Sequence, residues 1–361
     1  MKLAVFAVLA LAASGGHAQQ GTTAAQAPNA DTSYIDASGT AHITRVIPVP
    51  EDLSPEAKAM VGRQVSDAPV QQTLQERRQR MDASQAAHAK EALTIYPARV
   101  QESTMAGVPV RVVTPVADMD PHCVLLNLHG GSFNADSGSL NESIPMANLT
   151  KMKVIAVLYR LAPEHPFPAG VEDAIAVYRE LLKSYRPSHI AVYGTSAGAI
   201  MTGEVAVRIR QLGLPQPAAL GIFSGMGDFT HETDSWAMYT LNGLDGHHDL
   251  QETGTHDPYY VGSTDPHDPV LSPIFADLHN MPPTLFISSG RDALLSGTTL
   301  LQRAFLRAGN DNTQLVVFEG LPHAFWYNAG LPESKEADGI MARFFVRNLK
   351  PGAVSRATGG L

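Results

Sequence analysis

The chain has 361 residues, of which 44% are apolar, and a formal net charge of −9. This size suits a single α/β sheet with an inserted cap. The negative charge leaves no basic footprint for nucleic acid, and no stretch beyond the N-terminus approaches the roughly 20 apolar residues of a membrane span, so small or neutral partners are favoured.

The N-terminus has the order of a secretory signal. Lys2 precedes an unbroken apolar run over 3–13, and Gly16 and Ala18 then supply small residues at positions −3 and −1. We predict a signal peptide over 1–18, and hence a periplasmic or secreted bacterial protein; a short buried helix or strand is the alternative. Residues 19–50 are predicted to form a disordered leader, because Ala, Gln, Thr and Asn prevail in its first part.

Residues 51–93 carry helix signals and no strand signal. Ser54 is a typical N-cap and Pro55 occupies the first helical position. A second helix is predicted over about 70–93, where Gly and Pro are absent. Its apolar face is weak, so it either lies over another part of the molecule as a cap or forms a solvated arm.

From residue 94 the pattern becomes that of an α/β domain, predicted over 94–350. Residues 94–96 and 108–113 indicate an antiparallel pair around Ala106-Gly107. Short apolar runs then alternate with helices, which predicts a largely parallel sheet covered on both faces. The runs are 124–128, 154–158, 190–193, 218–223, 284–288 and 314–318, and the helices lie near 169–185, 197–212, 296–308 and 334–348.

One stretch, about 225–269, breaks this rhythm with many His, Asp, Gly and Thr residues, which is typical of a lid or binding insertion. Its histidines lack the His-x-x-x-His spacing of a zinc enzyme, so we expect no metal and no cofactor. They are His231, His247, His248, His256 and His267. Cys123, the only cysteine, cannot form an internal disulfide and reads as a small buried hydrophobe.

The strongest local signal is Gly194-Thr195-Ser196-Ala197-Gly198, which stands between a predicted strand and a predicted helix. That context is the one a nucleophile elbow requires, because the tight turn needs small residues two positions either side of the serine. The alternative is an ordinary strand–helix turn. We predict Ser196 as the nucleophile, with the helix N-terminus beneath it favouring negative charge.

A second signal, His129-Gly130-Gly131-Ser132-Phe133, ends the strand that begins near residue 124. Its glycines let the backbone approach a substrate, and with the Ala197 N–H they would form an oxyanion hole. The position of His129 invites a catalytic interpretation, which we reject: a strand-end histidine before glycines is predicted to brace the loop through hydrogen bonds.

Two further residues complete a catalytic triad. Asp292 and His323 follow the strands 284–288 and 314–318, so both are expected at the carboxyl edge of the sheet beside Ser196. Ser196 would attack, His323 would transfer the proton and Asp292 would orient the imidazole. Asp311 is a poorer candidate for the acid.

These motifs together resemble the bacterial hormone-sensitive-lipase (family IV) esterases of the α/β-hydrolase superfamily. The resemblance extends over roughly 93–348 and includes the segments 159–168, 272–273 and 281–285. It implies an α/β-hydrolase fold with an eight-stranded sheet. It also implies a helical cap, built from the N-terminal helices over 51–93 and the insertion after the sixth strand. The implied activity is cofactor-free hydrolysis of short-chain acyl esters.

The sequence departs from the family pattern in three places. Ser132 replaces the usual third glycine, although its N–H can still donate. Thr195 stands where Asp is common, as in one subgroup. The acid motif usually continues to Asp-Glu, whereas here Leu294-Leu295-Ser296-Gly297 follows.

Phe133, Trp236 and Tyr239 are predicted to line the substrate pocket. Alternatively, Trp236, Met238 and Tyr239 form a small core within the cap itself.

The substrate is predicted to be a small ester or lactone. An amidase or arylformamidase would use the same triad, and an inactive ligand-binding homologue is a third possibility, disfavoured because all three triad residues are present. A homodimer that pairs through the helix 334–348 and the last strand is one possibility for the oligomeric state.

Overall fold

The computed structural model describes residues 32–63, 72–244 and 257–349, so the predicted signal peptide over 1–18 lies outside the described residues. The chain divides into two units, of which the first ends at Pro48. The described part of this first unit holds a short antiparallel pair, β1 (Tyr34–Ile35) and β2 (Ala41–His42). The Asp36 carboxylate stabilises the turn between them by accepting hydrogen bonds from the N–H groups of Ser38 and Thr40. The stretch 19–50, expected to be disordered throughout, therefore contains a local hairpin.

The second unit, which begins at Val49, is built on one eight-stranded sheet. Its strands are β3 (Ala98–Met105), β4 (Val108–Pro115), β5 (Asp120–Leu128), β6 (Met152–Val157), β7 (Ile190–Thr195), β8 (Ala219–Phe223), β9 (Thr284–Arg291) and β10 (Thr313–Pro322). They lie in the order β10-β9-β8-β7-β5-β6-β4-β3. The pairs β3–β4 and β4–β6 are antiparallel and the others are parallel, which confirms the predicted mostly parallel sheet.

The first strand of the sheet is not where the alternation predicted it. Residues 94 and 95 end the helix α2 (Leu74–Ile95), and β3 begins only after Pro97. Thr94 is β-branched, yet its hydroxyl donates to the carbonyl of Lys90, and the N–H of Tyr96 donates to Ala92. The last helical turn is thus completed before Pro97 stops it. The predicted turn at Ala106-Gly107 is confirmed.

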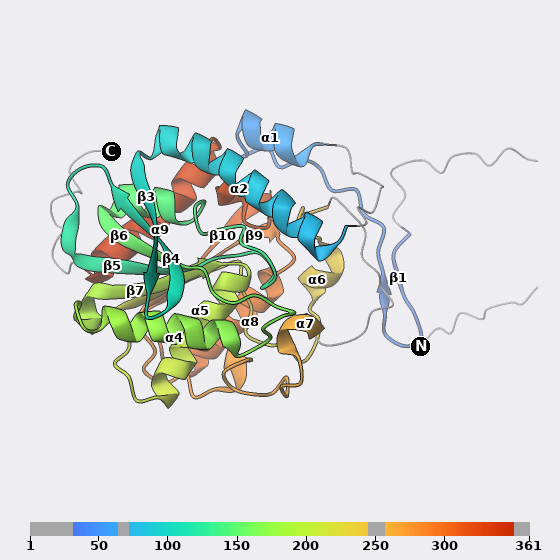
Figure 1. Cartoon of the computed structure of the whole chain (residues 1–361). Coiled ribbons are helices and arrows are strands. Elements are labelled where there is room, and N and C mark those ends of the chain that lie inside the picture. The colour runs from blue at the N-terminus through green and yellow to red at the C-terminus, as the bar shows by residue number, and fades with distance from the viewer. Residues whose placement is uncertain (1–31, 64–71, 245–256, 350–361) are drawn as a thin grey trace, which may run out of the picture. The chain divides into compact units, whose positions relative to one another are not determined.

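Helices cover both faces of the sheet, as predicted (Figure 1). Within β5, Val124, Leu126 and Leu128 pack into the core that α4, α5 and α8 cover, whereas Cys123 and Leu125 face the core beneath α3 and α9. This alternation is the two-residue period of a strand buried on both sides. The helices are α3 (Ser143–Thr150), α4 (Ala169–Leu181), α5 (Ala197–Gln211), α8 (Leu295–Arg307) and α9 (Pro332–Leu349), with short 3₁₀ turns η1 (Pro187–His189), η2 (Pro273–Phe275) and η3 (Phe325–Tyr327).

Helix α3 has no counterpart in the prediction. Six of its eight residues are buried, so it lacks the polar face that gives a surface helix its period. Periodicity alone cannot separate such a segment from a buried strand or a loop.

The first N-terminal helix begins at its predicted cap, whereas the second begins at Leu74 rather than near residue 70. The Ser54 hydroxyl accepts the N–H of Ala57 at the start of α1 (Pro55–Val61). Helix α2 starts with a capping box, in which Thr73 and Glu76 each accept the other's backbone N–H. Among the described helices, none is both long and apolar enough to cross a bilayer.

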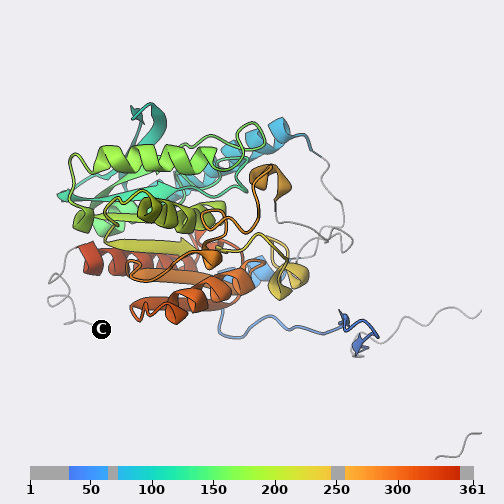
Figure 2. The same cartoon turned by 90° about the horizontal axis from the view of Figure 1, so that it is seen from below.

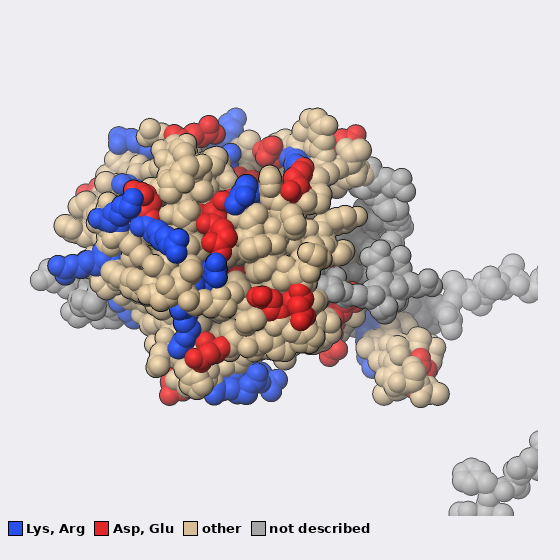
Figure 3. Space-filling view, turned by 60° about the horizontal axis from the view of Figure 1, so that its bottom comes forward, with Lys and Arg blue, Asp and Glu red and all other residues tan. Residues whose placement is uncertain are grey.

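The predicted insertion follows β8, which is the sixth strand of the sheet in chain order. Its described part contains α6 (Asp234–Met238) and α7 (Pro258–Val261), and both lie beyond the ends of the strands in two perpendicular views (Figures 1 and 2). The insertion therefore caps the edge of the sheet where the predicted site lies. On the face shown in Figure 3, acidic and basic side chains of the described residues are interspersed.

Candidate active site

Ser196 stands at a tight turn between β7 and α5. Its φ of 59° and ψ of −125° are strained for a residue with a side chain. The glycines on either side are required by space, because a Cβ on Gly194 or Gly198 would lie 2.2 or 1.8 Å from the carbonyl oxygen of Leu128. The predicted elbow is therefore present, with a partly exposed serine at its tip.

The loop after β5 approaches this turn closely. Gly131, Ser132 and Phe133 have φ values of 127°, 52° and 57°, so the backbone makes a left-handed bend. A Cβ on Gly131 would lie 2.0 Å from the Ala135 carbonyl oxygen, and a Cβ on Gly130 would lie 2.9 Å from that of Thr195. The two glycines allow this bend to form directly against the elbow.

One of the four predicted oxyanion donors is wrong. The N–H of Gly130 is already bonded to Glu142 Oε1 at 3.0 Å, so it cannot also serve a substrate. Within the described residues, the N–H groups of Gly131, Ser132 and Ala197 have no hydrogen-bond partner. Ala197 is the first residue of α5, where a helix leaves its N–H groups unpaired. Three of the predicted donors thus remain available.

His129 braces the loop, as its position predicted. It is buried, its Nδ1 lies 3.0 Å from the carbonyl oxygen of Gly130, and its ring stacks on Tyr159 with 4.1 Å between centroids. The Tyr159 hydroxyl in turn donates to the carbonyl of His129. These contacts hold the end of β5 and leave the imidazole without a role beside Ser196.

Asp292 and His323 are hydrogen-bonded to each other. The distance from His323 Nδ1 to Asp292 Oδ1 is 2.8 Å, and the carboxylate is fully buried. Burial by itself would raise the pKa of Asp292, but His323 and the hydrogen bonds that the carboxylate accepts hold this pKa below its ordinary value. The other ring nitrogen, His323 Nε2, is buried and has no partner among the described residues. This nitrogen can therefore act as a base.

Two serines that the sequence reasoning missed hold Asp292 in place. Ser288 Oγ donates to Asp292 Oδ2 at 2.7 Å, and Ser224 Oγ makes a short hydrogen bond to the same oxygen. The N–H of Leu294 donates to Oδ1. The available signal was positional, since Ser224 directly follows β8 and Ser288 lies in β9, at the same edge of the sheet.

Helix α2 contacts the loop after β5. Arg77 donates from Nε to Asn134 Oδ1 at 2.9 Å and from Nη2 to Ser132 Oγ at 3.3 Å. Arg78 bonds the carbonyl of Asn134 and forms an ion pair with Glu164. Of the two alternatives for this helix, a cap and a solvated arm, these contacts favour the cap.

A small cavity of about 70 Å³ opens beside Ser196. Phe133 and Trp236 line it, as predicted, whereas Tyr239 does not. Most of its walls are apolar, and Asp257 contributes a carboxyl group. Its lining residues are Ser132, Phe133, Ser196, Ala197, Ile200, Met226, Phe229, Trp236, Leu241, Asp257 and Leu294.

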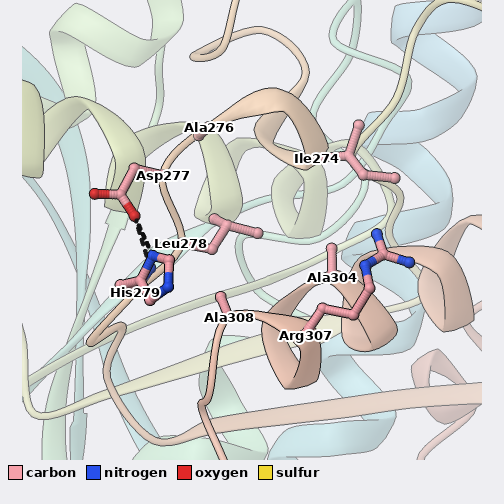
Figure 4. A pocket seen from close by; sticks show the side chains of 8 residues that line it. All are labelled: Ile274, Ala276, Asp277, Leu278, His279, Ala304, Arg307 and Ala308. Atoms are coloured by element: carbon pink, nitrogen blue, oxygen red, sulfur yellow. Dashed lines mark hydrogen bonds and ion pairs between the residues drawn. The ribbon is translucent and has the colours of Figure 1, made fainter.

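A larger hollow of about 580 Å³ lies between η2 and α8 (Figure 4). Its polar side chains are Asp277, His279 and Arg307, and the first two are hydrogen-bonded to each other at 2.8 Å. None of the predicted catalytic residues lines it. Chemistry rather than size therefore identifies the smaller cavity as the candidate site.

The described residues contain no group of three or more His, Cys, Asp or Glu side chains placed to hold a metal ion. In the insertion, His231 lies near Asp228 and His267 near Asp265, at 3.4 and 3.2 Å. The other three histidines, His247, His248 and His256, lie outside the described residues.

Comparisons with known proteins show the family of the chain. Residues 125–327, more than half of the chain, match a family described as alpha/beta hydrolase fold. An acetyl-hydrolase of Streptomyces hygroscopicus is 34% identical over 227 residues, which cover 61% of this chain and 74% of that protein. An esterase of Acinetobacter venetianus is 30% identical over 226 residues, with the same coverage.

Two solved structures are similar over most of the chain. The crystal structure of esterase E25 has a TM-score of 0.74 and 27% identity, covering 85% of this chain and 98% of its own. An esterase from the bacterial hormone-sensitive lipase family has a TM-score of 0.69 and 28% identity, covering 82% and 99%. The chain belongs to the α/β-hydrolase family. Its expected resemblance to the bacterial hormone-sensitive-lipase esterases is confirmed.

Proposed function

We propose that the protein is a serine esterase that hydrolyses short-chain acyl esters, with Ser196, His323 and Asp292 as its triad. The observation that carries this proposal is the 2.8 Å bond between Asp292 and His323, which leaves a buried Nε2 without a partner at the edge of the sheet that bears Ser196. An imidazole oriented in this way by a carboxylate is poised to accept a proton from a serine hydroxyl.

In this mechanism, Ser196 Oγ attacks the ester carbonyl while His323 Nε2 removes the hydroxyl proton. The N–H groups of Gly131, Ser132 and Ala197 stabilise the negative charge that develops on the carbonyl oxygen. The C–O bond to the alcohol then breaks as His323 returns the proton to the leaving oxygen. Water, activated by the same imidazole, attacks the acyl-enzyme and releases the acid.

The lining of the cavity supports an acyl ester as the substrate. Most of its walls are apolar and Ser196 lies among them, so an acyl chain bound there would place its carbonyl beside the serine. The name acetyl-hydrolase, which the Streptomyces hygroscopicus relative bears, supports a short acyl group.

The test is hydrolysis of p-nitrophenyl esters from C2 to C12 by the mature protein, by Ser196→Ala and by Ser103→Ala, an exposed serine on β3 that serves as the matched control. We expect activity that is greatest at C2 to C4, abolished in Ser196→Ala and unchanged in Ser103→Ala. A folded wild type inactive on every ester would refute the esterase proposal. Activity on aryl formamides would then support an amidase, and inactivity on these as well would support a ligand-binding homologue.

We also propose export to the periplasm or the medium, on the strength of the signal-like order of residues 1–18. Mass spectrometry of the protein recovered from the periplasmic and extracellular fractions of a bacterial host tests this. We expect a mature N-terminus at Gln19; an uncut chain confined to the cytosol would contradict it.

A further inference from the structure

A buried carboxyl group outside the triad lies where three parts of the proposed machinery meet. Glu142 directly precedes α3, and its side chain is buried behind the loop after β5. Its Oε1 accepts hydrogen bonds from the N–H of Gly130 at 3.0 Å and from the hydroxyl of Tyr327 at 2.6 Å. Its Oε2 accepts the N–H of Thr195 at 3.1 Å and the side-chain amide of Asn127 at 2.8 Å.

Each of three donors adjoins a different functional segment. Gly130 precedes the available N–H groups of Gly131 and Ser132. Thr195 precedes Ser196 in the elbow, and Tyr327 follows His323 by four residues. One side chain therefore holds together the loop of the oxyanion donors, the turn of the nucleophile and the loop of the base.

The surroundings are shaped to this carboxyl group. A Cβ on Gly138 would lie 1.8 Å from Glu142 Oε1 and 2.6 Å from the Tyr327 hydroxyl, so only glycine leaves the two groups room to meet. The four donors fill the acceptor positions of an ionised carboxylate. Three of them are N–H groups, which could not accept a hydrogen bond from Glu142 if its carboxyl group were protonated.

We propose that Glu142 is a positioning residue, which fixes the oxyanion loop, the nucleophile turn and the histidine loop relative to one another. This inference rests on the proposed esterase function. The oxyanion donors must point at the carbonyl oxygen of the ester that Ser196 attacks. Small shifts between these segments therefore reduce the stabilisation of the transition state more than they reduce the binding of the ester.

The pKa of Glu142 determines the pH at which its role is tested. Burial raises its pKa to about 7, although the bonds from Tyr327, Gly130 and Asn127 oppose this rise. The ionisable groups around it are Asp136, Tyr159, Tyr193 and Tyr327. An assay at pH 8 therefore keeps the carboxylate charged.

The decisive variant is Glu142→Gln, which has the same shape but presents an NH₂ group to one pair of donors. With p-nitrophenyl acetate at pH 8, we expect kcat to fall by about tenfold to a hundredfold while KM changes by less than about threefold. The inhibition constant of a trifluoromethyl ketone, whose serine adduct places an oxygen in the oxyanion hole, should rise by a similar factor.

The matched control is Asp338→Asn, since Asp338 is also a fully buried carboxyl group but lies on α9 beside Tyr96. We expect this variant to keep wild-type kcat, KM and inhibition constant. A folded Glu142→Gln variant with kcat within twofold of wild type, or with a change in KM alone, would overturn the inference.

If Glu142→Gln does not fold, Tyr327→Phe takes its place, because it removes one donor and leaves the other three. It should lower kcat by about threefold or more at unchanged KM; an unchanged kcat would overturn the inference. A wild type that hydrolyses no ester is a failure of the proposed function, whereas an active wild type with an unaffected variant is a failure of the role of Glu142.

Discussion

The indole Nε1 of Trp326 donates a 3.1 Å hydrogen bond to the hydroxyl of Thr195. Thr195 directly precedes Ser196, and Trp326 follows His323 by three residues. Both side chains are buried, so this bond ties the loop of the proposed base to the turn of the proposed nucleophile. It also gives a physical role to threonine at a position where aspartate is common in the family.

We predict that Thr195 and Trp326 are energetically coupled. Thr195→Val leaves the buried indole N–H without its acceptor and should lower the free energy of unfolding by about 1–3 kcal/mol. Trp326→Phe should also destabilise, but the double variant should be more stable than the sum of the two losses by about 1 kcal/mol. Urea unfolding of the four proteins measures this; additive effects would show that the bond contributes nothing.

Asp292→Asn should reduce kcat for p-nitrophenyl acetate by roughly four orders of magnitude, because an amide cannot hold the imidazole in its catalytic tautomer. Asp311→Asn is the matched control, since Asp311 is exposed and was the other acid considered. It should retain wild-type kcat. A comparable loss in both variants would argue against Asp292 as the acid of the triad.

The stability of the protein should fall in acid partly through Asp136. Burial opposes ionisation of this residue, but the His129 ring and the bonds from Ser139 lower its pKa to about 2. The pKa of Asp136 in the folded protein lies below its value of about 3.9 in the unfolded chain. Ionised Asp136 therefore stabilises the fold fully above about pH 3.9, and this stabilisation is lost as the pH falls toward 2. The free energy of unfolding of the wild type should exceed that of Asp136→Asn by about 2 kcal/mol at pH 6, and by less below pH 4.

Urea unfolding of Asp136→Asn and wild type between pH 6 and pH 3 tests this sign. A difference that stays constant over the whole range would contradict it.

Gly198→Ala should disrupt the elbow, because the added Cβ would lie 1.8 Å from the carbonyl oxygen of Leu128. We expect a loss of about 3 kcal/mol or more in the free energy of unfolding, with loss of activity. The control, Gly339→Ala in α9, meets only the guanidinium end of Arg343, at 3.1 Å. It should gain about 0.5–1 kcal/mol, since alanine is the better helix former. Equal thermal stability of the two variants would contradict the packing argument.

Trp236→Ala should widen the cavity beside Ser196. The ratio of kcat/KM for p-nitrophenyl hexanoate to that for the acetate should rise by roughly tenfold, because the longer acyl chain gains room. Tyr239→Ala removes a neighbouring aromatic side chain that does not line the cavity and should leave this ratio unchanged. A larger shift in Tyr239→Ala would mean that the acyl chain takes another route.

Local patterns were sufficient to predict the sheet, most helices and the loops that carry Ser196, Asp292 and His323. Each depends on signals a few residues long, such as the strand–turn–helix frame of Gly194 to Gly198. The bonds around these loops could not be predicted in this way. Glu142, Ser224 and Trp326 reach their partners only through the arrangement of the whole sheet, and none belongs to a recognisable motif.

Two of the local errors have clear physical causes. Thr94 and Ile95 have strand propensity, but they complete the last turn of α2, and Pro97 ends the helix only after them. Gly130 belongs to the same glycine pair as Gly131, so both were predicted as oxyanion donors. The N–H of Gly130, however, donates to the carboxyl group of Glu142, twelve residues further along the chain. Whether an N–H is available depends on distant partners that no short window contains.

The bond between Tyr327 and Glu142 joins residues 185 positions apart, and that between Ser54 and Glu333 joins residues 279 positions apart. Each of these contacts closes a long loop of chain, which costs conformational entropy and slows folding relative to a fold held by local contacts. Residues from near both described ends of the second unit thus hold it together. Loss of the residues after Pro322 would leave every described strand of the sheet in the chain and yet remove His323, the proposed base.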